Sequence, residues 1–204
     1  MDGPFNDEAL ILVDIQNDFC PGGALAVAEG DKIVSTVNRL VPRFPLVVST
    51  QDWHPRNHVS FKERGGPWPP HCVQGTHGAE FHPALDTTTV ANYFRKASSP
   101  EKDAYSEFEG TDEHGRTLDE FLKSRKVKRV YVVGLATDYC VKATVLDGLK
   151  LGYEVYAVTD AMRAVNVNPE DGAKALSEME SNGANLVTSD DILERSDPAS
   201  AGAR

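Results

Sequence analysis

Short apolar runs alternate with segments of helical spacing along most of the chain. The runs are apolar at nearly every position, which is typical of strands buried on both faces of a sheet. They predict strands at 9–16, 45–53, 90–97, 129–136, 154–161 and 184–190. Helical spacing, with caps and stops, predicts helices at 31–41, 116–126, 138–152 and 169–181.

Strands separated by helices predict a mostly parallel sheet of about six strands, covered by helices on both faces. The expected fold class is therefore α/β, a single-domain three-layer sandwich. We assign 1–195 to this domain and expect the polar tail 196–204 to be disordered. In such sheets the reactive groups gather beyond the carboxyl ends of the strands.

The chain of 204 residues is acidic, with 21 Lys and Arg against 31 Asp and Glu and a formal net charge of -10. A chain with this net charge is not expected to present the basic surface that binds phosphate groups. Neither a nucleic acid nor an anionic membrane is therefore expected as a partner. No apolar run approaches the roughly 18 residues of a membrane-spanning helix. The N-terminal stretch lacks the basic and cleavage-site pattern of a signal peptide.

Three cysteines, Cys20, Cys72 and Cys140, form no CxxC motif. Their odd number argues against a disulfide scaffold and indicates reduced thiols, as in a cytoplasm. We expect Cys20 and Cys72 to be structural. Cys140 differs, because it stands where an apolar run ends and a helical segment begins. It is either a small core residue or a nucleophile whose thiolate the helix N-terminus stabilises.

Two charged residues favour the nucleophile. Asp14 ends the first apolar run and Lys96 closes the third, so both are expected at the sheet edge that carries Cys140. Read singly, Asp14 can cap a turn and Lys96 can be a solvated strand end. Read together, the carboxylate can take the thiol proton while the ammonium holds the pair in its charged state.

The segment 53–89 contains five of the six histidines and has little periodicity, as functional loops often do. Asp52 and His54 end a strand, and His71 follows on a proline-stiffened loop. One carboxylate with two imidazoles suits a divalent transition metal with open positions. His58 or Glu63 is a candidate for a further ligand. The alternative is a polar loop whose histidines bond to backbone groups.

Aromatic residues border the same predicted edge. Phe19 and Trp68 lie in loops, and Tyr139 adjoins Cys140. A flat substrate can stack on such rings, although each ring can equally pack between loops.

Motifs in a fixed order connect these residues to a known family. They are ALILVDIQNDFCPGGALAV, STQDWHPRNHVSF, WPPHCVQGTHGAEFHP, FRKA, YSEFEGT and VYVVGLATDYCVKATVLDGLKLGYEVYAVTDA. From about residue 9 to about 190 the chain resembles the nicotinamidases (pyrazinamidases) of the isochorismatase-like cysteine hydrolases. The metal pair, WPPHC and the ATD-x-C turn together separate nicotinamidases from metal-free relatives.

The resemblance implies a role for each candidate. The implied catalytic triad is Asp14, Lys96 and Cys140, and the implied metal ligands are Asp52, His54 and His71. His58 and Glu63 both stand where different members place a fourth ligand. The backbone amides of Ala136 and Cys140 correspond to the oxyanion hole, beside a cis peptide that joins Ala136 to Thr137 or lies one bond earlier. The implied pocket residues are Phe19, Leu25, Trp68 and Tyr139, and position 139 is often His in relatives.

The resemblance also implies hydrolysis of nicotinamide to nicotinate and ammonia through a thioester, as part of NAD salvage, and activity on pyrazinamide. The implied cofactor is one divalent ion, zinc first and iron or manganese as alternatives. Relatives range from monomers to larger assemblies, which leaves a homo-oligomer open. Two rival functions remain: a metal-free relative acting on another small amide, or a ligand-binding protein without catalysis.

Overall fold

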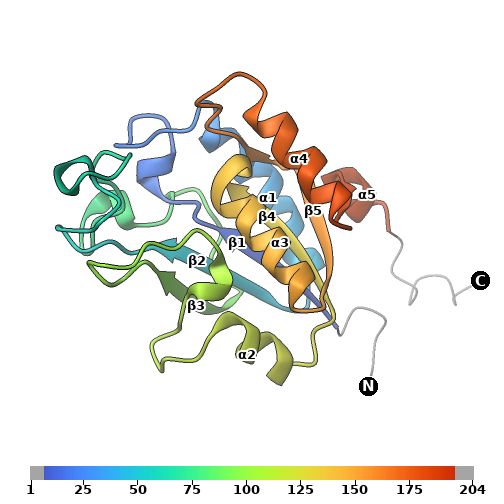
Figure 1. Cartoon of the computed structure of the whole chain (residues 1–204). Coiled ribbons are helices and arrows are strands. Elements are labelled where there is room, and N and C mark those ends of the chain that lie inside the picture. The colour runs from blue at the N-terminus through green and yellow to red at the C-terminus, as the bar shows by residue number, and fades with distance from the viewer. Residues whose placement is uncertain (1–6, 196–204) are drawn as a thin grey trace, which may run out of the picture.

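Six parallel strands form the centre of the protein in the computed structural model, which describes residues 7–195 (Figure 1). The strands are β1 (Glu8–Val13), β2 (Val47–Asp52), β3 (Val90–Lys96), β4 (Arg129–Leu135), β5 (Glu154–Arg163) and β6 (Asn185–Val187). Their order across the sheet is β3-β2-β1-β4-β5-β6, and every neighbouring pair is parallel. The predicted α/β class is confirmed. The expected tail 196–204 lies outside the described residues.

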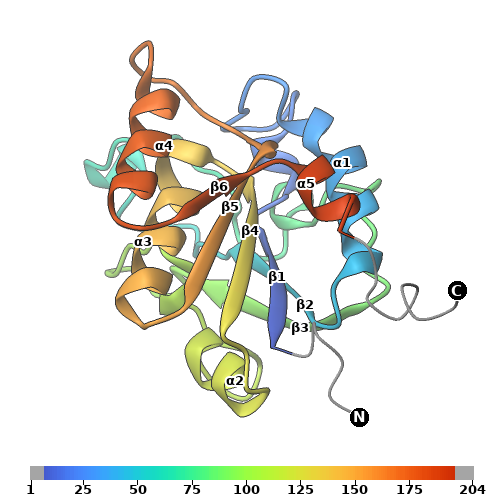
Figure 2. The ribbon, with the colours of Figure 1, turned by 90° about the vertical axis from the view of Figure 1, so that its right-hand side faces the viewer.

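Helices cover both faces of the sheet, because alternate residues of each strand point to opposite sides. The helices are α1 (Ile33–Leu40), α2 (Leu118–Ser124), α3 (Lys142–Lys150), α4 (Asp171–Ser181) and α5 (Ser189–Leu193). Leu10 and Leu12 of β1 pack with α1 and α5, whereas Ile11 and Val13 pack on the face of α2, α3 and α4. Figure 2 shows the sheet between these two helical layers. No helix in the range 7–195 is long and apolar enough to cross a membrane.

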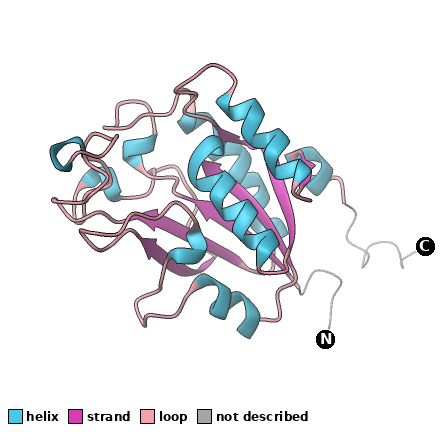
Figure 3. Ribbon diagram, viewed as in Figure 1, coloured by secondary structure: helices cyan, strands magenta, loops and turns pink. Residues whose placement is uncertain are grey.

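The strand order changes direction at β1, because β2 lies on one side of it and β4 on the other. Ligands of open parallel sheets bind at such a switch point, beyond the carboxyl ends of the strands. Loops and short turns cover this end of the sheet (Figure 3). The turn after β4, Thr137–Val141, is a single turn of π-helix, a rare element that is frequent at functional sites. The fold thus directs the first residues after β1 and β4 toward one region.

Gly134 of β4 allows the close approach of β4 to β1. Its φ is +125°, and a Cβ there would collide with the backbone of Val13. Gly152, after α3, also has a positive φ, but a Cβ there would meet no atom.

We expect Gly134→Ala to lower the free energy of unfolding by about 2–5 kcal/mol, because backbone strain and overpacking add. Gly152→Ala introduces backbone strain without a collision, and should lower the free energy of unfolding by only about 1–2 kcal/mol. Urea denaturation of both variants measures the difference, and equal losses would show that β4 and β1 can move apart.

Candidate active site and metal centre

The ends of four strands converge as the sequence predicted. Asp14 is the first residue after β1, Asp52 ends β2, and Lys96 ends β3 as the register partner of Asp52. Cys140 lies in the π-turn after β4. All four side chains are buried. The structure thus brings together, in the interior, four polar or reactive side chains that are distant in sequence.

The ammonium of Lys96 is the centre of this group. Its Nζ donates a hydrogen bond to Asp14 and lies 2.7 Å from Asp52 Oδ1 and 2.9 Å from Glu107 Oε1. Burial alone would lower the pKa of Lys96, but the carboxylates of Asp14 and Asp52 raise it well above its ordinary value. Lys96 is therefore a permanent positive charge in the interior.

Asp14 is held from two sides. The Thr50 hydroxyl lies 3.1 Å from Asp14 Oδ1 and can donate to it, while Lys96 donates to Oδ2. Burial raises the pKa of Asp14 above its ordinary value, although the charge of Lys96 acts against this. A carboxylate with a raised pKa is a better proton acceptor, as general base catalysis requires.

The Cys140 thiol is a neighbour of both acids. Its Sγ and one carboxylate oxygen each of Asp14 and Asp52 lie within 4.8 Å of one another. Burial raises the pKa of the thiol well above its ordinary value, and Lys96 opposes this. Burial therefore favours the neutral thiol, and the carboxylates of Asp14 and Asp52 are the bases of this cluster.

Three of the predicted metal ligands form a compact group. Ligand atoms of Asp52, His54 and His71 all lie within 4.8 Å of one another, and the three residues are buried. His54 Nε2 is 3.3 Å and His71 Nε2 is 3.8 Å from Asp52 Oδ2. Two imidazole nitrogens and a carboxylate oxygen grouped this closely suit a divalent transition metal.

The hydrogen bonds of the two histidines fit a metal. His71 Nδ1 lies 2.8 Å from the Pro69 carbonyl and must donate to it, so Nε2 carries a lone pair. Burial lowers the pKa of His71 and favours this neutral form. Neither ring nitrogen of buried His54 has a hydrogen-bond partner among the described residues. Buried polar atoms without partners are rare. A bound cation would provide a partner for one of the two His54 nitrogens.

The two candidates for a further ligand lie outside this group. His58 Nε2 is 3.0 Å from the Lys102 carbonyl and donates to it, and His58 Nδ1 lies 2.7 Å from Ser60 Oγ. Both nitrogens are therefore occupied, although the ring itself packs against His54. Glu63 is exposed in a short 3-10 turn.

A small cavity of about 30 Å³ joins the thiol and the metal group. It is lined by Phe19, Leu25, Asp52, Trp68, His71, Tyr105, Ala136, Tyr139, Cys140 and Val165. This set includes all four predicted pocket residues and both residues of the predicted oxyanion hole. The Leu135–Ala136 bond is cis, which is the earlier of the two expected positions.

Three residues near the site were not singled out from the sequence. Tyr105 lines the cavity, and its hydroxyl accepts a hydrogen bond of 3.0 Å from Trp68 Nε1. Val165 also lines the cavity, and the carboxylate of Asp138 accepts a hydrogen bond of 2.9 Å from its backbone amide. Glu107 contacts Lys96. Tyr105 and Glu107 stand in the quoted motif YSEFEGT, which was the only available signal for either.

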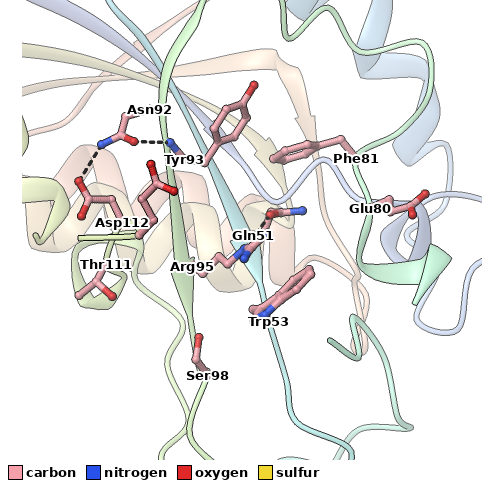
Figure 4. A pocket seen from close by; sticks show the side chains of 11 residues that line it. Gln51, Trp53, Glu80, Phe81, Asn92, Tyr93, Arg95, Ser98, Thr111 and Asp112 are labelled. Atoms are coloured by element: carbon pink, nitrogen blue, oxygen red, sulfur yellow. Dashed lines mark hydrogen bonds between the residues drawn. The ribbon is translucent and has the colours of Figure 1, made fainter. Parts of the chain in front are cut away.

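A larger cavity of about 620 Å³ lies on the opposite face of β2 and β3 (Figure 4). Gln51, Trp53 and Arg95 line it, and each is a chain neighbour of Asp52 or Lys96, so the alternation of strands explains its position. The Arg95 guanidinium stacks 3.8 Å over the Trp53 ring and Nε donates to Gln51 at 3.2 Å. None of the predicted site residues lines this cavity.

An isochorismatase domain matches residues 8–191. The chain belongs to the isochorismatase family. Within this family it is 46% identical to the nicotinamidase of Escherichia coli (strain K12), over 88% of this chain and 94% of the relative. It is 52% identical to the pyrazinamidase of Pyrococcus horikoshii, solved in complex with zinc, with a TM-score of 0.80 over 89% of this chain and 99% of that one. PnC1 from L. infantum, solved in complex with nicotinate, is 36% identical, with a TM-score of 0.85 over 93% and 96%.

The metal group generates a prediction about ligand number. We expect His71→Ala to weaken metal binding by at least tenfold. Loss of a residue that only hydrogen-bonds to a metal ligand typically weakens binding roughly 10–100-fold, and loss of the ligand itself should cost at least as much. His58→Ala should keep the wild-type affinity, because its nitrogens bond to protein groups. Competition with a chelator, read by elemental analysis, measures both. Equal weakening would make His58 a ligand.

Proposed function

We propose that this protein is a nicotinamidase, which hydrolyses nicotinamide to nicotinate and ammonia and also accepts pyrazinamide. The supporting observation is the buried cluster of Asp14, Lys96 and Cys140, whose thiol lines the same cavity as Asp52 and His71 of the metal group. The relatives that carry this name, and the nicotinate-bound structure from L. infantum, support the same substrate class. We place the activity in NAD salvage and in the cytoplasm, where three free thiols stay reduced.

Zinc is the metal that we propose, held by Asp52, His54 and His71. One carboxylate and two imidazoles suit it, and the pyrazinamidase of P. horikoshii was solved with zinc. When bound, the ion supplies an electron-pair acceptor for the ring nitrogen of the substrate. The aromatic side chains of Phe19, Trp68 and Tyr139 then hold the ring by its faces and edges.

The first chemical step forms a thioester. Asp14 takes the thiol proton while Cys140 Sγ attacks the carboxamide carbon, and the carbonyl electrons move to oxygen. The backbone amides of Ala136 and Cys140 stabilise this oxyanion. Asp14 passes the proton to the amide nitrogen, the C–N bond breaks, and ammonia leaves. Lys96 keeps Asp14 oriented and ionised between these transfers.

The second step releases nicotinate. Asp14 removes a proton from water, and the hydroxide attacks the thioester carbon. The C–S bond then breaks, the sulfur takes the proton from Asp14, and the product acid releases its remaining proton to solvent and leaves as nicotinate. One carboxyl group thus acts twice as base and twice as acid, as in other covalent hydrolases.

We expect Cys140→Ala to reduce ammonia release from nicotinamide by more than about 10³-fold, because no other side chain can form the acyl intermediate. Its metal content should equal that of wild type. Cys20→Ala, which removes a buried thiol that does not line the cavity, is the matched control and should keep wild-type turnover. Substantial turnover by the Cys140 variant would exclude the thioester.

A further inference from the structure

Glu107 is a buried carboxyl group beside the catalytic cluster that the mechanism above does not use. It begins the 3-10 turn Glu107–Glu109 and is 0% exposed. Its backbone N–H donates to Thr144 Oγ1 at 3.1 Å, and that hydroxyl donates to the Cys140 carbonyl at 2.7 Å. Two consecutive hydrogen bonds therefore fix Glu107 relative to the nucleophile.

The hydrogen bonds differ between the two acids that meet Lys96. Both oxygens of Asp14 accept, one from Thr50 and one from Lys96. Neither oxygen of Glu107 has a hydrogen-bond partner in the described part of the chain, although Oε1 lies within ion-pair distance of Lys96. A buried carboxylate with fewer hydrogen bonds costs more free energy to ionise, so the geometry favours ionisation of Asp14 over ionisation of Glu107.

The surrounding charges favour the same assignment. The groups that face Glu107 are Asp14 after β1, Asp52 on β2, Lys96 on β3 and the Cys140 thiol. Asp52 is shared with the metal group, which leaves one ammonium for Asp14 and Glu107. Burial and the charge of Asp14 raise the pKa of Glu107 well above its usual range. Burial also raises the pKa of Asp14, and the charge of Lys96 opposes the rise at both groups.

We propose that Glu107 is a positioning residue that keeps a proton beside Asp14, so that Asp14 is the carboxylate that pairs with Lys96 and faces Cys140. A neutral Glu107 donates its O–H to Asp14 and adds no second negative charge near the thiol. Its catalytic consequence rests on the proposed nicotinamidase activity, whereas its protonation can be measured without any substrate.

Infrared spectroscopy of the metal-loaded protein tests the protonation directly. A protonated carboxyl has a carbonyl stretch separate from those of carboxylates. The wild-type spectrum at neutral pH should contain this band, Glu107→Gln should lose it, and Glu109→Gln should retain it. Glu109 is the matched control, because it lies in the same turn but faces Lys102 at the surface. Absence of the band from wild type, or its persistence in Glu107→Gln, would overturn the proposal.

Kinetics test the consequence for Asp14. Glu107→Ala should lower kcat for nicotinamide roughly tenfold, the effect of one hydrogen bond to a charged group, with KM unchanged because Glu107 does not line the cavity. Glu107→Gln, which keeps a neutral donor, should recover most of this loss. The alkaline fall in kcat/KM should move to higher pH in Glu107→Gln, because this variant cannot ionise there.

Equal losses in the Ala and Gln variants would mean that an ionised Glu107 is required, and no loss in either would mean that the residue has no role. Both results contradict the proposal. If wild type fails to hydrolyse nicotinamide, the proposed function is wrong, and the infrared comparison still decides the protonation of Glu107.

Discussion

A positive charge in the interior organises this protein. The ammonium of Lys96 has no access to solvent, and it is stable there only because acidic side chains from three other segments surround it. Asp14 and Asp52 reach it because β1, β2 and β3 are neighbours in the sheet, and Glu107 reaches it from the turn before α2. The ion pairs therefore connect the strand order with the position of every acid in the site.

Asp52 gives this charge network its link to ligand binding. One of its oxygens faces Lys96, and the other faces His54 and His71. The carboxylate of Asp52 thus connects the Lys96 cluster with the metal group. In the proposed mechanism a substrate held by the metal group lies beside the thiol, because a carboxylate oxygen of Asp52 lies within 4.8 Å of Cys140 Sγ. The orientation of the carboxamide in this mechanism therefore depends on the position of Asp52 at the end of β2.

Much of this arrangement follows from the sequence alone. Alternating strands and helices place Asp14, Asp52, Lys96 and Cys140 at one edge of a parallel sheet, and the resemblance assigns the pocket residues. Helix α5 escaped prediction because its five residues are too few for a periodic signal, although Thr188 and Asp191 form a capping box. The contact of Glu107 with Lys96 and of His58 with Lys102 depends on how irregular loops fold back, which no local pattern records.

The aromatic wall of the small cavity has a consequence for affinity. Trp68 donates a hydrogen bond to the Tyr105 hydroxyl and packs edge-on against Tyr139, so the three side chains fix one another before any ligand is bound. Side chains that are already ordered lose little conformational entropy when a ligand packs against them. The binding free energy of a flat ligand in this cavity is therefore reduced less by ordering of the protein than it would be on a wall of freely rotating side chains.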